Sequence, residues 1–418
     1  MSQTSIPFGH PLARKVFGAA VFTEITRKQT FGNRLTGPAP TLDAETAKAE
    51  RMQTAPGYPS IRVTDLTKSR GDTVSVDMFN ILQGKPVMGD KKISGRMMAL
   101  KSKSMDIKIN QMRGGVDPGG RMTQQRTVHD LRTVGRIELS GWWARALDQT
   151  KLIHFAGARG SMNTADWVIP LASDADFNEI MVNAVQAPTF NRHFYAGDAT
   201  AIDTLDTADI LTLDDIDRLR AAIDEADIPL QPIMFPDDPA SMDEPLYVLY
   251  VSSRQWHYLQ TRTGDKAWRT FLSNARERGS KNPLFSGEPG MWNGILVRKS
   301  ARAIRFLPGE SVTVATSAAS YTETTKTVPT LATDYAVDRA ILLGAQALAE
   351  VWGKDSDSGM HMRWWEEVTD HGGTYEASVA GMGGCAKLRF ADANGVDTDH
   401  GVMVLDSVAP DPRKVKIA

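Results

Sequence analysis

The stretch TQQRTVHDLRTVGRIELSGWWARALDQTKLIHF, residues 123–155, decides the architecture that we predict for this chain. Charged residues occupy one face of it, and we predict an amphipathic helix whose other, apolar face packs on a partner. Thr123 is the expected N-cap, and the run from Gly157 to Gly160 is the expected end. The apolar face is defined by residues that mostly recur three or four positions apart, the spacing of one helix face: Val128, Leu131, Val134, Trp142, Trp143, Ala146 and Leu147.

Such a helix is long for a compact domain. Unbroken, it would span roughly 50 Å at ~1.5 Å per residue, more than the ~30 Å width of a small domain. Gly135 and Gly141 each cost about 1 kcal/mol relative to Ala, so the helix can bend at either position. The stretch therefore predicts an elongated subunit.

The composition is that of an ordinary globular protein. The chain has 418 residues, 41% hydrophobic and 23% charged, enough for two or three compact units. A net charge of −2 argues against a dedicated nucleic-acid binder, although it allows a locally basic surface. Cys385 is the only cysteine, so no intrachain disulfide can form, and a reducing compartment fits. We find no secretory signal or membrane-spanning run and expect a cytoplasm-like solvent.

Charge is distributed unevenly along the chain. Residues 198–228 contain ten Asp/Glu and two Arg, a net charge of −8, whereas residues 85–103 contain six Lys/Arg and one Asp, a net charge of +5. Complementary patches of this kind are what self-association needs, but two solvated faces of one monomer would give the same pattern.

Two segments before the long helix are expected to extend from the body. Residues 1–60 show no hydrophobic period and many prolines, which predicts a mildly basic N-terminal arm that orders only on another surface. Residues 73–112 contain two runs of alternating apolar and polar residues and are expected to form one long hairpin. Its connection, residues 83–95, has turn chemistry and several lysines. A lone two-stranded ribbon is marginal in water, so it must pack on another subunit or on its own body.

The rest of the chain mixes helices and strands without a regular βαβ alternation, which predicts the α+β class. The expected helices are residues 212–227, with Thr212 and Asp215 in capping-box positions, residues 266–278, and residues 337–352 ending at Gly353. Residues 311–328 are expected to form a strand pair or an exposed loop. The expected strands are residues 246–251, 295–298, 303–306, 375–379, 385–390 and 401–405.

Motifs for chemistry are weak in this sequence. The glycine run 381–387 lacks the Gly-Lys-Ser/Thr order of a phosphate-binding loop. The acidic residues 392–399 lack the closing glutamate of a calcium loop and are expected to form a turn. The histidines show no metal-ligand spacing, and Cys385 is expected to be buried and inert. We therefore predict no enzyme activity, no catalytic residue, no cofactor and no metal site.

Several short runs resemble the major capsid protein family of certain short-tailed bacteriophages related to coliphage N-four. They occur in order along the chain: NILQGKPVMGD (80–90), MDIKINQ (105–111), MTQQRT (122–127), DLR (130–132), residues 152–160, ARERGSKNPLFSG (275–287), GMWNG (290–294), LGAQA (343–347) and DHGV (399–402). Residues 297–302 and 311–330 depart from the family pattern. Each run alone is a weak signature, and the resemblance is carried by their occurring in the same order as in the family.

The resemblance implies the Hong-Kong-97-type capsid fold. Its parts would be an N-terminal arm (1–60), an extended loop (61–115), a peripheral domain (116–235) with the spine helix 123–155 and the acidic segment, an axial domain (236–360), and strands returning to the peripheral domain (361–418). Pentamers and hexamers of this subunit would enclose double-stranded DNA, contacted nonspecifically. Scaffolding, portal and decoration proteins are further partners that the family implies, and a membrane is not.

The basic hairpin tip would then lie on an adjacent subunit, with the acidic segment as one candidate receiving surface. The candidate contact residues are Lys85, Lys91, Lys92 and Arg96 in the tip and Asp206, Asp209, Asp214 and Asp215 in the acidic segment. An encapsulin-like compartment has the same fold but encloses cargo enzymes, and an unrecognised enzyme is the second alternative. The contents of purified particles would separate the first of these from a phage capsid.

Overall fold

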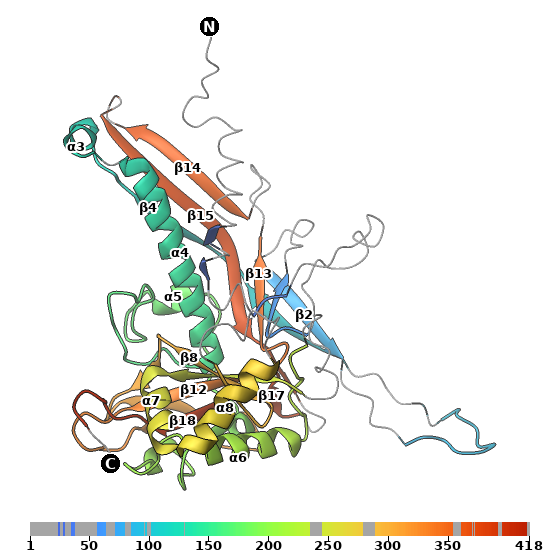
Figure 1. The fold of residues 1–418 in the computed structure, drawn as a ribbon. Helices are drawn as coiled ribbons and strands as arrows, with labels where there is room; N and C mark the ends of the chain where they lie inside the picture. Colours follow the sequence, from blue (N-terminus) through green and yellow to red (C-terminus); the bar gives the residue numbers. More distant parts are fainter. Residues whose placement is uncertain are drawn as a thin grey trace.

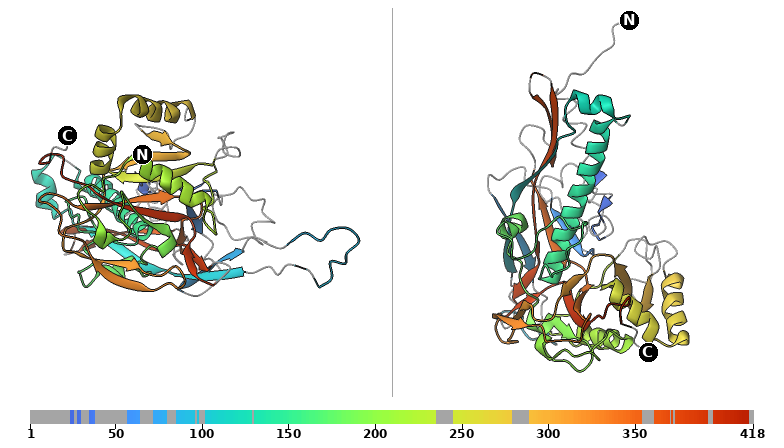
Figure 2. Two further views of the ribbon diagram at one scale, coloured as in Figure 1. Left: turned by 90° about the horizontal axis from the view of Figure 1, so that it is seen from below. Right: turned by 90° about the vertical axis from the view of Figure 1, so that its left-hand side faces the viewer.

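The computed structural model shows an elongated subunit made of a compact lower part and a tall upper part (Figure 1). A ribbon ending in a loop projects to one side of both (Figure 2). The structure describes residues 24–25, 28–29, 35–37, 57–63, 72–79, 85–95, 97, 102–128, 130–234, 245–278, 289–353, 361–369, 371, 373–391 and 395–415. Most of the expected N-terminal arm, residues 1–60, therefore lies outside the described residues.

The lower part is built on a seven-stranded sheet of order β5-β18-β12-β6-β8-β7, with β9 also paired to β12. Every residue of the central strands β6, β12 and β18 is buried, and for β6 the continuous apolar run of residues 246–251 predicts this burial. The helices α6, α7 and α8 pack around this sheet (Figure 1). The bounds are β5 His193–Tyr195, β6 Tyr247–Ser252, β7 Gly290–Trp292, β8 Ile295–Ser300, β9 Ile304–Phe306, β12 Val337–Leu343, β18 Val402–Val408, α6 Leu213–Asp224, α7 Ser253–Arg262 and α8 Asp265–Arg278.

The upper part is a five-stranded sheet with the helix α4 lying along it (Figures 1 and 2). Its order is β1-β13-β15-β14. β4 also pairs with β15, on the side of that strand opposite to β14. Close packing of helix and sheet requires small residues: a Cβ at Gly114 of β4 would lie 2.6 Å from Trp142 Cζ3 of the helix. The bounds are β1 Ser60–Val63, β4 Asn110–Val116, β13 Leu348–Trp352, β14 Met362–Thr369, β15 Thr374–Lys387 and α4 Leu131–Ala156.

Shorter elements connect or extend these two sheets. β10 and β11 form a separate hairpin, which confirms the expected strand pair in residues 311–328. The bounds are α3 Arg121–Arg126, α5 Phe177–Met181, the 3₁₀ turns Phe190–Arg192 and Ile202–Thr204, β10 Ser311–Ala315, β11 Glu323–Thr327, β16 Arg389–Ala391 and β17 Asp397–Asp399.

The predicted long helix is present but differs in its N-terminal part. It divides into α3, which ends at Arg126, and α4, which begins at Leu131, so the interruption precedes both Gly135 and Gly141. Asp130 is the N-cap of α4, because its side chain accepts a hydrogen bond from Arg132 N. The helix ends at Gly157 as predicted, in a left-handed conformation with φ of 66°. Its 26 residues give a length of about 39 Å.

Two apolar residues assigned to the buried face are exposed. Val128 lies in the break between α3 and α4 and is fully exposed, and Val134 is 44% exposed. The side chains that do pack on the sheet come from further along the helix, chiefly Leu139, Trp143 and Ala144. The apolar spacing was therefore a correct guide to the middle of the helix and a wrong one at its start.

The helix predicted for residues 337–352 is wrong. This segment forms the two strands β12 and β13, which belong to different sheets. Gly344 and Gln346 lie in the turn between them, where Gln346 has a φ of 54°. A short apolar run cannot be assigned to a helix or a strand by period alone, and here residues 337–343 are buried on both sides in the middle of a sheet. The other expected helices and strands are present, although residues 375–379 and 385–387 belong to the single long strand β15, and Arg389 and Phe390 belong to β16.

The spine helix joins the lower sheet through a buried ionic cluster. Arg339 of β12 donates to both carboxylate oxygens of Asp406 on β18, at 2.7 Å each, and to Ala156 O in the last turn of α4 at 2.9 Å. His193 Nε2 lies 2.7 Å from Asp406 Oδ2, the oxygen to which Arg339 Nη2 donates, and 3.3 Å from Arg339 Nη2 itself. Burial alone would raise the pKa of Asp406, but Arg339 and His193 hold it far below its usual value. These hydrogen bonds hold the C-terminal end of α4 on the lower sheet.

Replacing Asp406 with Asn should destabilise the subunit strongly, because the Arg339 charge would then be buried without a counter-charge. We expect a loss of about 3–5 kcal/mol in the free energy of unfolding, measured by urea denaturation of unassembled subunits. The control is Asp224→Asn, which breaks the exposed pair with Arg220 and should cost at most about 0.5 kcal/mol. Equal small losses in both variants would contradict the role of the cluster.

Candidate assembly surfaces

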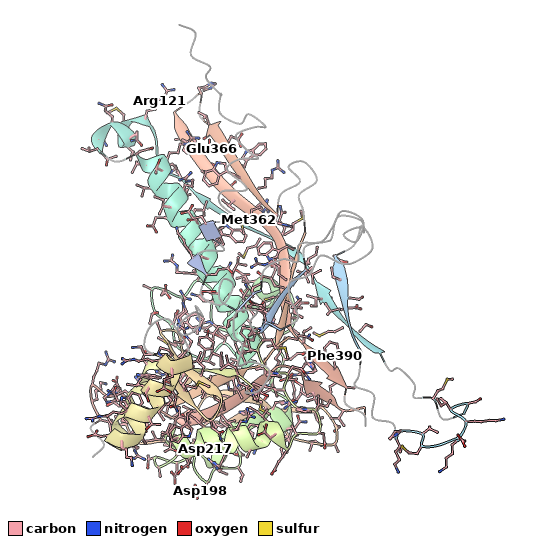
Figure 3. The ribbon with its side chains drawn as sticks, turned by 45° about the vertical axis from the view of Figure 1, so that its right-hand side comes forward. Arg121, Asp198, Asp217, Met362, Glu366 and Phe390 are labelled. Carbon is pink, nitrogen blue, oxygen red and sulfur yellow. The ribbon has the colours of Figure 1, made fainter. Side chains whose placement is uncertain are left out.

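The ribbon consists of β2 (Thr73–Phe79) and β3 (Ser102–Lys108), paired antiparallel with Thr73 opposite Lys108. This confirms the predicted hairpin. Its base packs on the subunit's own body, because Val74 and Ile107 are buried against β1, β13 and the end of β15. The tip does not pack there, and residues 85–95 project far from the body (Figure 3). The ribbon is thus anchored at one end and free at the other.

The tip carries both positive charge and exposed apolar side chains. Lys85, Lys91 and Lys92 are exposed, whereas Arg96 lies outside the described residues. Among them stand three large apolar residues with high exposed fractions: Met88 at 71%, Ile93 at 61% and Met97 at 78%. Three such residues on one loop form a surface suited to contact with another molecule. Sequence reasoning missed their role, although apolar residues within a lysine-rich turn were the available signal.

The four acidic candidates divide into two exposed and two buried residues. Asp206 and Asp214 are exposed. Asp209 is buried and accepts a hydrogen bond from Asp206 N at 2.8 Å. Asp215 is buried in the capping box of α6, where it accepts from Thr212 N and Thr212 Oγ1 at 2.8 Å each and pairs with Arg218. Asp209 and Asp215 therefore serve the subunit's own fold and are not available to a neighbouring chain.

Other acidic residues of this segment also have partners within the subunit. Asp203 lies 2.9 Å from Lys326 Nζ, and Asp217 accepts from Trp292 Nε1 at 3.0 Å. Asp198 and Asp217 both lie at the lower end of the molecule, on the side away from the spine tip (Figure 3). The net charge read from the sequence thus overstates the acidity that this surface offers to a neighbour.

The top of the upper part carries a second exposed apolar patch. Its residues come from α3, the break after it and the first turns of α4: Met122, Val128, Val134 and Ile137, with exposed fractions of 63%, 102%, 44% and 45%. Arg132 forms a bidentate pair with Glu366 of β14, with its shortest N···O distance at 2.7 Å, and so holds the helix to the sheet edge. We refer to these four apolar residues as the spine-tip patch.

Ionic clusters inside the subunit lie at the junctions of elements. Glu350 pairs with Lys151 at 3.0 Å and with Arg62 at 3.1 Å, and these cations outweigh burial and lower its pKa to about 2. Asp399 pairs with Lys387 at 2.6 Å and Arg389 at 2.8 Å. Burial lowers the pKa of Lys387 to about 8, although Asp399 opposes this shift. These groups are packed structural pairs.

Reactive chemistry is not supported by the remaining titratable groups. Cys385 is buried as predicted, and burial raises the pKa of its thiol to about 12, which disfavours the reactive thiolate. Within the described residues, no group of three or more His, Cys, Asp or Glu side chains could hold a metal ion. No helix in the same part of the chain is long and apolar enough to cross a membrane.

The arrangement of a projecting ribbon, a long spine helix along an upper sheet and a lower mixed sheet defines the Hong-Kong-97-type capsid fold. The capsid of Ralstonia phage GP4 superposes with a TM-score of 0.69 at 24% identity and covers 98% of this chain and 99% of that one. The cyanophage Pam1 capsid gives a TM-score of 0.57 at 18% identity over 85% of this chain and 90% of that one. These likenesses confirm the predicted fold.

Residues 5–411 match the family model described as phage capsid protein, and the chain belongs to that family. It is a phage capsid protein and hence part of the virion. The major capsid protein of Pseudomonas phage KPP25 is 24% identical over 264 residues, 57% of this chain. That match spans 62% of the relative's own length.

Two buried histidines should make the subunit sensitive to acid. Burial lowers the pKa values of His154 and His400 to about 4, against ~6.5 in an unfolded chain. Between these two pH values the unfolded chain binds more protons, so the stability is complete above pH ~6.5 and decreases as the pH falls toward 4.

His154→Leu should therefore reduce the pH dependence of unfolding between pH 6.5 and 4 by up to about 1.4 kcal/mol per pH unit, the contribution of one proton. The measurement is urea unfolding at a series of pH values. His257→Gln serves as control because His257 is exposed. A pH dependence unchanged in His154→Leu would show that this imidazole is already solvated in the folded subunit.

Proposed function

We propose that the chain builds the icosahedral shell of a tailed-phage head by assembling into pentamers and hexamers around double-stranded DNA. The observation that carries this proposal is the ribbon, whose anchored base and free apolar, basic tip leave it incomplete in a single subunit. A two-stranded ribbon is marginally stable without further packing. A neighbouring copy of the chain supplies that packing in a shell.

The geometry of the contact suits closed rings. The tip and its receiving surface are different patches, so the contact is heterologous, and repetition about a rotation axis closes it into a ring. Each subunit also makes several contacts at once, and multivalency compounds modest individual interfaces into a stable lattice. Function then follows from assembly and not from catalysis, and we infer no enzymatic role.

We propose that the tip lies on the acidic segment of an adjacent copy. Lys85, Lys91 and Lys92 of the tip would face the two exposed candidates, Asp206 and Asp214. Complementary charges of this kind fix the register of an interface and accelerate encounter more than they add affinity. The apolar tip residues would supply the buried area, and the spine-tip patch would serve a separate contact with a further copy.

The packing suggests a modified division into domains. We propose to keep the N-terminal arm (1–60), to limit the extended loop to the ribbon β2–β3 and its connection, and to assign β1 and β4 to the peripheral unit, because both strands belong to the upper sheet. The acidic helix α6 packs on the lower sheet, with Ile216, Leu219 and Ile223 in the same core as Leu249 and Leu405. We therefore assign α6 and the final strand β18 to the axial unit, and the strands β14 and β15 to the peripheral one.

Further partners follow from this role. We propose assembly in the host cytoplasm, with scaffolding, portal and decoration proteins as possible associates. Contact with packaged DNA would be nonspecific and made by Arg and Lys side chains through phosphate charge. The direct test of the whole proposal is electron microscopy of the expressed protein, which should show closed shells. A chain that stays monomeric over a wide concentration range would contradict it.

Reversal of charge at the tip should impair assembly. In Lys85→Glu/Lys91→Glu/Lys92→Glu the tip would repel the acidic segment, so we expect a loss of most closed particles in sedimentation assays. The subunit's own melting temperature should change little, because these side chains are exposed. The matched control replaces the same three residues with Arg and should assemble normally. Full particle yield from the Glu variant would refute the charged contact.

A compensating reversal should identify the receiving surface. Asp206→Lys/Asp214→Lys in the tip-reversed background restores opposite charges across the proposed contact, so particle yield should recover at least in part. The same acidic reversal alone should assemble poorly. If the combined variant yields no more particles than the tip variant, the tip lies on another surface of the neighbouring copy.

A further inference from the structure

The helix α8, on the outside of the lower part, carries a row of positive charge (Figure 1). Lys266 and Arg269 are three residues apart, and Arg276 follows seven residues later, which is the spacing of one helix face. All three side chains are exposed. The other face of the helix is buried, with Phe271 in the core of the lower part. We refer to the three cationic residues as the α8 stripe.

The stripe belongs to a wider basic surface. Residues 253–278, which form α7 and α8, contain six Arg and Lys against two acidic residues, a net charge of +4 in a chain whose total is −2. Arg262 at the end of α7 and Lys299 near the end of β8 are exposed as well. Lys299 lines a small cavity together with Trp256 of α7, and Trp256 packs on Trp268 of α8 with ring centroids 5.5 Å apart. The positive charge is therefore gathered around one pair of helices.

The stability of the helix does not explain the stripe. Within the described residues, the side chains of Lys266, Arg269 and Arg276 form no ion pair, although Asp265 lies four residues before Arg269, a spacing at which helical pairs form. Like charges three residues apart repel, and Lys266 lies in the first turn, where the helix dipole disfavours a cation. A counter-charge from outside the subunit would relieve both effects.

The chemistry of this surface favours a nucleic acid over a protein as the partner. Protein interfaces have an apolar and aromatic core, and none of the large apolar side chains exposed in the described part of the chain lies in residues 253–278. Protein–DNA interfaces are more polar and much more positive. A DNA duplex carries one negative charge per ~1.7 Å of its axis, and the stripe extends over about 15 Å from Lys266 to Arg276.

We propose that the α8 stripe binds the phosphate backbone of double-stranded DNA without regard to its sequence. This inference rests on the proposed function, in which the shell encloses DNA, and it assigns the DNA contact to one surface of the subunit. The surface that bears α8 would therefore face the interior of the shell. The stripe shares no residue with the tip or with the acidic candidates, so it can be altered without changing the proposed contact between subunits.

The salt dependence of DNA binding tests the stripe. A short random-sequence duplex is titrated with unassembled full-length subunits at several salt concentrations, and binding is followed by fluorescence anisotropy. Each lost phosphate contact lowers the slope of log K against log salt by about 0.9, so Lys266→Gln/Arg269→Gln/Arg276→Gln should lower its magnitude by about 2.7. Gln has a helix propensity close to that of Lys and Arg, so α8 should remain folded, which circular dichroism checks.

Two matched variants separate charge from position. Exchanging the cations within the stripe, in Lys266→Arg/Arg269→Lys/Arg276→Lys, keeps every charge and should leave the slope at its wild-type value. If the Gln variant fails to fold, Arg269→Gln alone replaces it and should lower the slope by about 0.9.

The second matched variant, Arg113→Gln/Arg121→Gln/Arg126→Gln, removes three exposed charges from the upper part. It changes the net charge as much as the stripe variant does, yet it should bind the duplex with the wild-type slope. An equal fall of the slope in this variant would mean that net charge and not the stripe governs binding, which overturns the inference.

Other outcomes also decide the matter. The inference is overturned if the stripe variant keeps the wild-type slope, or if it loses binding to poly-L-glutamate but not to DNA, because the stripe would then contact an acidic protein. Particle yield separates this result from the proposed function: the stripe variant should form closed shells normally. A wild-type chain that forms no shells would contradict the proposed function, whereas the duplex titration would still decide whether the stripe binds DNA.

Discussion

The Arg339 guanidinium lies where the spine helix meets the lower sheet, and the rest of the architecture depends on the bonds it makes there. It satisfies the buried Asp406 carboxylate and the carbonyl of Ala156 at the end of α4. The largest hydrophobic core continues through the same junction, with Ile153 and Phe155 of the helix packed among residues of both sheets. A tall upper part and a compact lower part thus behave as one body with a defined angle between them.

That rigidity explains what the projecting parts can do. A ribbon anchored by Val74 and Ile107 reaches outward from the body, so its base occupies a defined position relative to the core. The spine-tip patch is likewise held by the Arg132–Glu366 pair. Positioned in this way, separate surfaces can meet partner copies at fixed angles, which is the geometric requirement for a closed shell.

The sequence was a good guide where one local signal dominated. Alternation predicted the ribbon, the Thr212 capping box predicted α6, and Gly157 predicted the end of the spine. The failures have a common cause. Residues 337–352 and Val134 were judged by apolar spacing alone, yet burial is set by which elements pack together in three dimensions, and a short apolar run satisfies more than one period.

The candidate surfaces were predictable only in part. The sequence showed a basic tip and an acidic segment, but not that Asp209 and Asp215 would be used inside the subunit or that Met88, Ile93 and Met97 would stand exposed on the tip. Net charge counts residues wherever they lie. Carboxylates that cap a helix N-terminus are not available to another molecule. A segment that begins a helix therefore offers a neighbour fewer acidic side chains than its sequence contains.

Amide hydrogen exchange, compared between unassembled subunits and purified particles, tests the central claim most directly. If neighbouring copies complete the ribbon, its outer amides should exchange rapidly in the free subunit and become protected in the shell. The amides of β12 and β18 at the Arg339 junction should be equally protected in both states. Equal protection of the ribbon before and after assembly would show that it is complete within one chain and would contradict the account.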